Sequence, residues 1–480
     1  MSFASYEFIL LFLPVTVLLF WAAQRMSVSI ALWLLCFASL VFYIYWNPRD
    51  VVVAGASIAF NYQAAKVIIQ GGTRGKLMFS VAVTGNLFAL GYFKYLGFAV
   101  ELLAMAYGDN QVNIPAIVLP LGISFFTFTQ IAYLADCYAG KIPTGKHNPR
   151  DYLLFVSFFP HLIAGPILHH ADIIPQFHAR FRESRKLKMR AGMVMFTIGL
   201  VKKVLIADHF ARIANPVFLA ADTGELVPSA DAWSGALAYT FQLYFDFSGY
   251  SDMAVGTALL VGMHIPFNFF SPYRATSIIE FWRRWHITLS AFLRDYLYIP
   301  LGGNRRGRSR RYVNVFITML LGGVWHGAGV NFVIWGALHG GFIVINHAWR
   351  DFVVARIGTG SDSLPVRIMA YLLTMGCVVV GWVFFRAHTT GGAIAMLKSM
   401  AMLPGLSSTF LSSVFTPNGA AIAFGTALVT GFPNSRQIHD WMFERGFATP
   451  WVPMGIACGM AMAMSLIFIS ADSPFLYFQF

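Results

Sequence analysis

Long apolar runs constrain this sequence more than any other feature. Stretches of about twenty mostly hydrophobic residues recur along the chain, and each is long enough to cross the ~30 Å hydrocarbon core of a bilayer as a helix. Only 11% of the 480 residues are charged, whereas a typical soluble domain is about 25% charged. The sequence therefore predicts a polytopic membrane protein.

The spacing of the hydrophobic residues decides between the two architectures that span bilayers. Backbone polar groups find no water in lipid, so spanning segments are helices or the strands of a closed barrel. The apolar runs do not alternate over ~10 residues, as barrel strands do. We therefore expect an all-α transmembrane helical bundle, with residues 1–480 forming a single integral membrane domain. The expected apolar segments are 5–24, 28–47, 50–70, 77–106, 115–137, 151–168, 191–213, 232–262, 287–301, 313–347, 366–386, 417–432 and 452–471.

Three of these segments depart from a simple crossing. Those near 160–170 and 287–301 are short and interrupted by Pro or Gly, which predicts re-entrant or amphipathic elements buried in protein or lining a wet cavity. Segment 313–347 is long enough to form two helices. The N-terminus has neither a basic n-region nor a small-residue cleavage site, which favours a retained first helix over a signal peptide.

The formal net charge of +13 comes in large part from two basic stretches, 178–190 and 304–311. Lys and Arg concentrate in cytoplasmic loops of membrane proteins, so we expect both stretches to face the cytoplasm. They could also help to bind an anionic cytosolic donor such as coenzyme A. Nucleic-acid binding is not expected, because the remainder of the chain is buried in lipid. The four cysteines are scattered without metal-ligand spacing, so neither a metal site nor a disulfide framework is expected.

Ionisable residues gather in the middle of the chain. Asp246 and Asp252 lie in an apolar run, and such groups cost at least ~2.5 kcal/mol at the bilayer centre unless they face a partner or a cavity. A continuous helix over 278–299 would allow Glu280 to pair with Arg283 or Arg284, and would place His286 on the face of Arg283. The alternative is an interfacial amphipathic helix anchored by its Arg and Trp side chains.

The stretch "GGVWHGAG" places His326 among four glycines. Small residues let a backbone, a ligand or a partner helix approach closely. An imidazole with an ordinary pKa of ~6.5 is suited to proton transfer near neutral pH, so His326 is a candidate general base for a hydroxyl group. The alternative is a buried histidine bonded to a carbonyl oxygen. His339 also lies among glycines, and we expect it to be a packing residue.

At these residues the chain resembles the membrane-bound O-acyltransferase family, in its bacterial alginate O-acetylation branch. The resemblance covers nearly the whole chain and is densest in a signature core over 119–340. The matching stretches are "LPLGISFFTFTQIAYLADCY", "FFPHLIAGPIL", "LYFDFSGYSDMA", "EFWRRWHITLSAFLRDYLYIPLGGNRRG", "LLGGVWHGAGVNFVIWGALHG", "WVFFRA" and the terminal "FLYFQF".

The resemblance implies a helical bundle around a central tunnel. It implies a catalytic role for His326 and a second signature position at His286, which would position or polarise the donor. It further implies acetyl-CoA as acyl donor with no bound cofactor, and an exported polysaccharide as acceptor. Periplasmic acetyltransferase partners would complete the delivery, and the location would be the bacterial inner membrane.

Other residues receive weaker assignments. Arg283 and Arg284 are candidates for donor binding, and Asp246, Asp252 and His161 are candidates for lining the tunnel. Peptidoglycan O-acetylation and D-alanyl transfer to teichoic acid remain alternatives within the family. Outside it, broken helices and buried charges also suit a proton-coupled transporter. A non-enzymatic scaffold that recruits periplasmic transferases is a further alternative.

Overall fold

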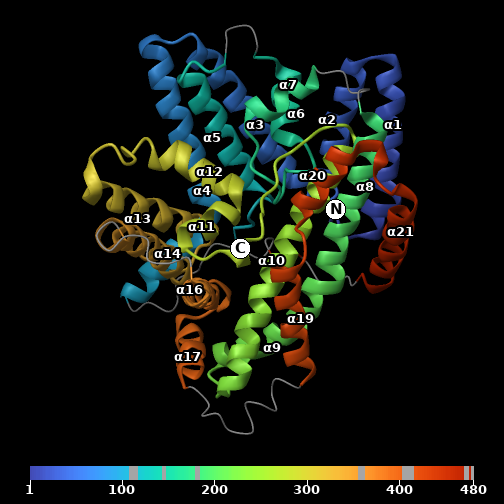
Figure 1. The fold of residues 1–480 in the computed structure, drawn as a ribbon. Helices are drawn as coiled ribbons and strands as arrows, with labels where there is room; N and C mark the ends of the chain where they lie inside the picture. Colours follow the sequence, from blue (N-terminus) through green and yellow to red (C-terminus); the bar gives the residue numbers. More distant parts are fainter. Residues whose placement is uncertain are drawn as a thin grey trace. The chain divides into compact units, whose positions relative to one another are not determined.

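The computed structural model describes residues 1–107, 117–142, 147–178, 184–354, 363–402, 416–469 and 475–476. Regular structure in these residues is helical throughout (Figure 1). The first part contains η1 (Glu7–Phe12), α1 (Leu13–Met26), α2 (Val28–Ile44), α3 (Pro48–Ile69), α4 (Gly72–Tyr107), α5 (Ile123–Tyr138), α6 (Pro149–Ser157), α7 (His170–Phe177) and α8 (Arg185–Val201). The middle contains η2 (Lys202–Ala207), α9 (Asp208–Thr223), α10 (Ser229–Leu260), η3 (Pro272–Arg274), α11 (Ile278–Arg284), α12 (Ile287–Leu293) and η4 (Arg294–Tyr298). The last part contains α13 (Gly307–His326), α14 (Val330–Trp349), η5 (Arg350–Val354), α16 (Leu364–Arg386), α17 (Thr390–Ala401), α19 (Pro417–Gly431), α20 (Ser435–Arg445), η6 (Gly446–Ala448) and α21 (Trp451–Phe468).

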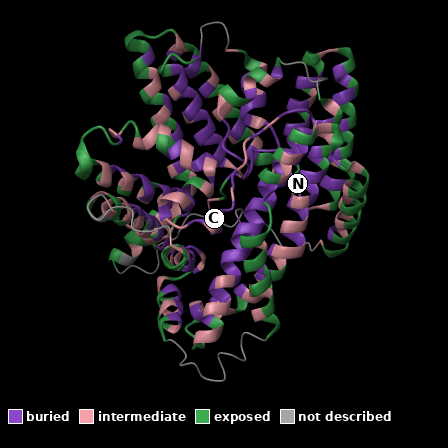
Figure 2. Cartoon of the chain, viewed as in Figure 1, coloured by how far each residue is buried: buried purple, intermediate pink, exposed green. Residues whose placement is uncertain are grey.

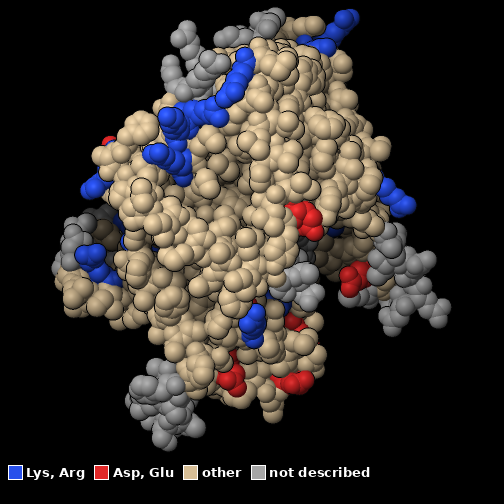
Figure 3. Space-filling view, turned by 90° about the vertical axis from the view of Figure 1, so that its right-hand side faces the viewer, with Lys and Arg blue, Asp and Glu red and all other residues tan. Residues whose placement is uncertain are grey.

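Six helical stretches within the described ranges are long and apolar enough to cross a membrane. They are Glu7–Met26, Pro48–Ile69, Gly72–Ala104, Val330–Phe352, Leu364–Arg386 and Trp451–Phe468. Two of them, on α4 and α21, expose most of their residues (Figure 2), as helices facing lipid do. Charged side chains cover little of the face shown in Figure 3, where a group of Lys and Arg lies at the upper left. The expected all-α, polytopic helical bundle is thus confirmed.

The described chain forms two compact units. Among the described residues, the first comprises those of 1–200, 250–267 and 442–476, and the second comprises those of 201–249 and 268–441. The prediction of a single integral membrane domain over 1–480 is not tested by this division. The stretches 179–183 of the first basic segment and 477–480 of the terminal motif lie outside the described residues.

In the first unit, small and amide side chains bring helices together. Asn61 of α3 and Asn86 of α4 exchange two amide hydrogen bonds of 3.0 and 2.6 Å, the kind of polar contact that joins membrane helices. Gly192 of α8 and Gly256 of α10 allow a closer approach. A Cβ atom at Gly256 would lie 2.5 Å from the backbone nitrogen of Phe196, so this crossing requires glycine.

In the second unit, α13 and α14 form a tightly packed pair (Figure 1). A Cβ atom at Gly323 would lie 2.4 Å from the carbonyl oxygen of Phe332 and 2.8 Å from the Cα of Gly336. The two backbones therefore touch where both helices carry glycine. At the start of α14, Asn331 donates 2.8 Å to the carbonyl of Ala387, which ties the end of α16 to this pair.

The predicted interruptions are present, with one correction. Segment 313–347 is divided between two helices, and α6 ends at Ser157 before a non-helical stretch over 158–169. The assumption of a continuous helix over 278–299 is wrong, because the chain leaves helical geometry at Trp285 and His286. Trp285 is extended, and a new helix, α12, begins after His286.

Candidate active site

His326 is the last residue of α13, at the point where the chain turns back into α14. The next residue, Gly327, is extended, and a Cβ atom there would lie 2.1 Å from the ring of Phe332. Only glycine therefore fits the turn that follows the histidine. The His326 side chain is buried but not sealed, since 7% of the residue is exposed.

Aromatic rings surround His326, and we call Trp325, Trp335 and Phe385 the aromatic cage. Their ring centroids lie 5.0, 4.9 and 5.2 Å from that of the imidazole. All three meet the imidazole at steep angles, between 68° and 84°. Edge-to-face packing of this kind fixes the plane of a ring. The cage therefore holds the imidazole in one orientation, and 7% of the residue remains exposed.

His339 belongs to the same cluster through Trp335, whose ring centroid lies 4.9 Å from that of His339. His339 is completely buried, and its Nδ1 accepts a 3.2 Å hydrogen bond from the indole nitrogen of Trp282. A neutral imidazole that accepts at Nδ1 carries its proton on Nε2. Nε2 faces Gly381, where a Cβ atom would approach to 2.6 Å. Trp335 therefore links the two histidines, which stand thirteen residues apart in the sequence.

His286 occupies the break between α11 and α12. Its backbone is left-handed, with φ +42° and ψ +57°, a conformation that costs about 1–3 kcal/mol in a residue other than glycine. The surroundings impose it: the backbone N–H of Ile287 donates 3.0 Å to the carbonyl of Asn268, and the Thr288 hydroxyl donates 2.7 Å to the Asn268 side chain. The imidazole is 1% exposed and meets the ring of Phe247 edge-on at 4.8 Å.

A series of rings joins the surroundings of His286 to those of His326. Phe247 contacts Phe269 at 5.1 Å, and Phe269 contacts Trp285 at 5.0 Å. Trp285 then contacts Trp382 at 4.9 Å, and Trp382 contacts Phe385 of the cage at 5.5 Å. Both histidines predicted to carry the chemistry thus lie in one aromatic region of the second unit.

The two arginines before His286 differ in position. Arg284 forms the predicted pair with Glu280, at 2.7 Å, whereas Arg283 is exposed. The expectation that His286 shares a helix face with Arg283 is wrong, because the helix ends between them.

Asp246 forms a buried ion cluster with a residue that sequence reasoning missed. Lys203, on η2, lies 2.9 Å from Asp246 and 2.7 Å from Asp208. Burying one unpaired charge would be costly, whereas the cluster satisfies charges of both signs. The signal was present in the sequence, since Lys203 stands in an apolar run with Asp208 five positions later.

The two remaining candidates belong to the first unit. His161 lies in the non-helical stretch after α6 and is 2% exposed, with its Nε2 2.9 Å from the carbonyl oxygen of Phe155. This is the geometry of a histidine that holds a backbone carbonyl in place. Asp252, on α10, is buried, with only 4% of the residue exposed.

Sequence reasoning also missed the aromatic residues that position the histidines. Trp335 stands four residues before His339 on α14, and this spacing places two side chains on one helix face. Trp382 and Phe385 belong to "WVFFRA", a stretch that carried the family resemblance without an assigned role. No spacing rule connects that stretch with α13.

Comparison with known proteins gives the site its context. Residues 142–364 match the model of the membrane-bound O-acyltransferase family, a range that contains both His286 and His326. The protein named "Probable alginate O-acetylase AlgI" from Pseudomonas aeruginosa is 40% identical, over 92% of this chain and 82% of that protein. This chain belongs to the membrane-bound O-acyltransferase family.

Other relatives are named for different activities. The peptidoglycan O-acetyltransferase of Helicobacter pylori is 38% identical over 98% of this chain and 96% of its own length. The teichoic acid D-alanyltransferase of Streptococcus thermophilus is 29% identical over 55% of this chain and 68% of its own. The protein is a multi-pass membrane O-acyltransferase, and family membership favours an enzyme over a transporter or a scaffold.

Proposed function

We propose that this protein transfers an acetyl group from acetyl-CoA to a hydroxyl group, for O-acetylation of an exported polysaccharide. The observation that carries the proposal is His326, held in the aromatic cage and still partly accessible at the end of α13. A dry, ordered site favours acyl transfer to a chosen hydroxyl, because water would otherwise compete as the acceptor.

The chemistry follows from an imidazole in this position. The acceptor oxygen attacks the carbonyl carbon of the thioester while His326 takes the hydroxyl proton. The carbon–sulfur bond then breaks, and the departing sulfur takes the proton from His326 to leave as a free thiol. The histidine returns to its neutral state, so no cofactor is consumed.

His286 is proposed to position or polarise the donor thioester. Its strained backbone and its packing against Phe247 support a fixed orientation for this imidazole. Arg283 and Arg284 remain weaker candidates for contacts with donor phosphates. Asp246, Asp252 and His161 are proposed to line or support a central tunnel, with the ion pair to Lys203 favouring a supporting role for Asp246.

The donor side is proposed to be cytosolic. Four exposed arginines support this orientation, since Lys and Arg concentrate in cytoplasmic loops: Arg305, Arg306, Arg308 and Arg310. The enzyme would reside in a bacterial inner membrane and work with periplasmic acetyltransferase partners. Alginate or a similar exopolysaccharide is the favoured acceptor, given the relative in Pseudomonas aeruginosa. Peptidoglycan is the second candidate because its O-acetyltransferase aligns over almost the full length, and D-alanyl transfer is supported only by more distant relatives.

The proposal is tested with His326→Gln and His326→Ala. Glutamine keeps hydrogen-bonding capacity but does not take up a proton near neutral pH, so both variants should lose about 10²–10⁴-fold in acetyl-CoA turnover. The matched control is His347→Gln, a histidine on α14 outside the cage. Turnover is measured in detergent, together with polymer acetyl content in cells, at equal protein levels. Near-normal activity of His326→Gln would remove His326 as the base.

A further inference from the structure

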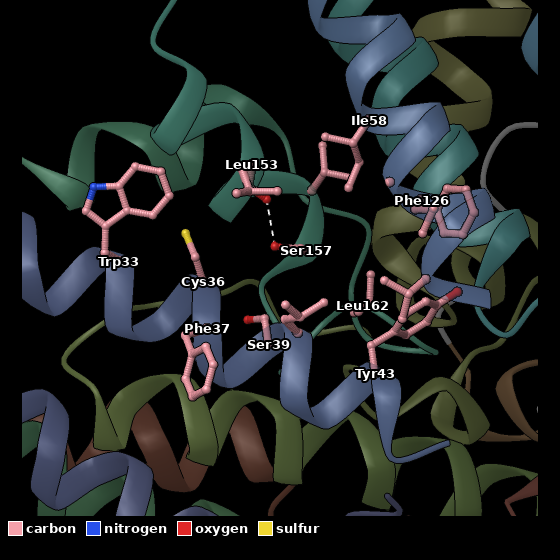
Figure 4. Close-up of a pocket in the computed structure, with 15 residues that line it drawn as sticks. Trp33, Cys36, Phe37, Ser39, Tyr43, Ile58, Phe126, Leu153, Ser157 and Leu162 are labelled. Carbon is pink, nitrogen blue, oxygen red and sulfur yellow. Dashed lines mark hydrogen bonds between the residues drawn. The ribbon is translucent and has the colours of Figure 1, made fainter. Parts of the chain in front are cut away.

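The first unit contains an apolar cavity of about 320 Å³ between α2, α3 and α6 (Figure 4). Cys36 and Ser39 on α2 face Leu153 and Ser157 on α6 across this space. Its other walls come from α3, α5 and Leu162. None of the residues assigned to catalysis lines it. Its most deeply buried lining residues include Phe126 and Leu162.

The hydroxyl groups of the lining are engaged within the protein. Ser157 donates 2.7 Å to the carbonyl of Leu153, and Tyr43 donates 2.7 Å to the carbonyl of Leu121. Ser39 accepts a 3.1 Å bond from the backbone N–H of Phe159. A buried water needs two to four polar partners, and the hydroxyl groups of this lining are already hydrogen-bonded to backbone groups of the protein. The chemistry of the cavity therefore favours hydrocarbon over water or a polar ligand.

The cavity adjoins a surface suited to contact with lipid. Trp33, Phe37 and Leu40 are 52%, 66% and 42% exposed along one face of α2. The neighbouring helix α3 is one of the apolar helices long enough to span a membrane. In a bilayer this face is in contact with lipids, and the acyl chains of lipids are apolar, as the cavity lining is.

Gly55 of α3 is exposed and lies on the open side of the cavity. It lines the cavity, and a Cβ atom at this position would meet no other atom within 4 Å. An apolar cavity of about 150 Å³ holds a benzene-sized molecule, so the observed volume accommodates a hydrocarbon segment roughly twice as large. Ligand pockets generally begin at about 300 Å³.

From this lining and this opening, we propose that the α2–α3–α6 cavity binds a fatty acyl chain of a membrane phospholipid. The chain enters from the face of Trp33 and Phe37 and reaches Phe126 and Leu162, which line the cavity and are 2% and 4% exposed. The site recognises hydrocarbon rather than a headgroup. It is independent of the proposed acetyl transfer, and either proposal stands if the other fails.

The test uses a phosphatidylethanolamine that carries a diazirine near the end of one acyl chain. The full-length protein is reconstituted in vesicles containing this lipid and irradiated, and mass spectrometry locates the adducts. Adducts on Phe126 or Leu162 are expected, because chains in the surrounding bilayer do not reach buried residues. Adducts confined to outward residues such as Phe37 would overturn the proposal.

Filling the cavity provides the matched comparison. Gly55→Leu places a side chain in the open space and should abolish the buried adducts. Gly91→Leu, on α4, is the control, because a Cβ atom there also meets nothing within 4 Å and the position does not line the cavity. Should Gly55→Leu fail to fold, Ile58→Phe fills the same space. Undiminished buried labelling in the folded filling variant would contradict the proposal, as would preferential labelling by a free diazirine fatty acid.

Discussion

The α13–α14 pair and the α2–α3–α6 cavity use the same kind of residue for opposite results. Gly323 lies at a crossing so tight that a Cβ atom would come within 2.4 Å of a backbone oxygen, whereas Gly55 borders empty space. In the first region glycine lets two backbones touch and sets the histidine turn. In the second it leaves a gap that the protein does not fill. A glycine in a membrane helix therefore does not by itself indicate close packing. The atoms that surround it decide whether the helices touch there.

The largest expected effect is the difference in stability between substitutions of these two glycines. Gly323→Leu should destabilise the protein by at least about 1–3 kcal/mol, the usual cost of overpacking, because the obstacle is backbone that cannot rotate away. Gly55→Leu should leave stability unchanged or raise it. Thermal unfolding of both variants in the same detergent measures the difference. Similar midpoints would show that the two glycines are equivalent after all.

A substitution in the aromatic cage should affect the rate rather than the fold. Trp335→Phe keeps a ring between His326 and His339 but reduces its size, so the base shifts within the cage. A misplacement of ~1 Å can cost about 100-fold in rate, and we expect a loss approaching that size at normal protein abundance. Phe126→Leu, an aromatic change in the cavity wall, is the control for acetyl-CoA turnover. An equal loss in both variants would argue against a specific role for the cage.

The hydrogen bond to His339 gives a smaller effect. His339→Leu leaves the indole N–H of Trp282 without its acceptor, and an unsatisfied buried donor costs about 1–3 kcal/mol. Denaturation in mixed micelles should show this loss. His339→Asn, which retains an acceptor, should recover part of it. No recovery would show that packing of the imidazole matters more than its hydrogen bond.

The smallest effect is expected on the cavity side. Ser157→Ala removes a hydroxyl bonded to the carbonyl of Leu153 in the same helix, and the resulting change should stay within about 0.5 kcal/mol. The same denaturation assay applies. A destabilisation as large as that of His339→Leu would mean that the Ser157 hydroxyl also supports contacts across the cavity.

The sequence was most informative where a local rule decides the structure. The length of the apolar runs predicted membrane helices, and the length of 313–347 predicted that this segment forms two of them. The break at His286 could not be predicted in the same way. The sequence "FWRRWH" contains neither Gly nor Pro, and the left-handed backbone depends on hydrogen bonds to Asn268, eighteen residues earlier.

The candidate site shows the same limit. Polar side chains such as His286 and His326 stand out in an apolar sequence, because burying a polar group costs free energy unless it has a partner or a function. The residues that orient them are themselves apolar. Trp335 and Phe385 look like ordinary core until the fold brings α14 and α16 against the end of α13, and only tertiary contacts distinguish them from other aromatic residues.

The position of His326 at the end of α13 has an electrostatic consequence. Aligned peptide dipoles give the C-terminus of a helix about −0.5 of an elementary charge, and a cation placed there gains up to about 2 kcal/mol in a partly buried setting. A histidine that accepts a proton at this point becomes an imidazolium at the negative end of a 20-residue helix. The helix thereby stabilises the charged form of the base at the step in which it is needed.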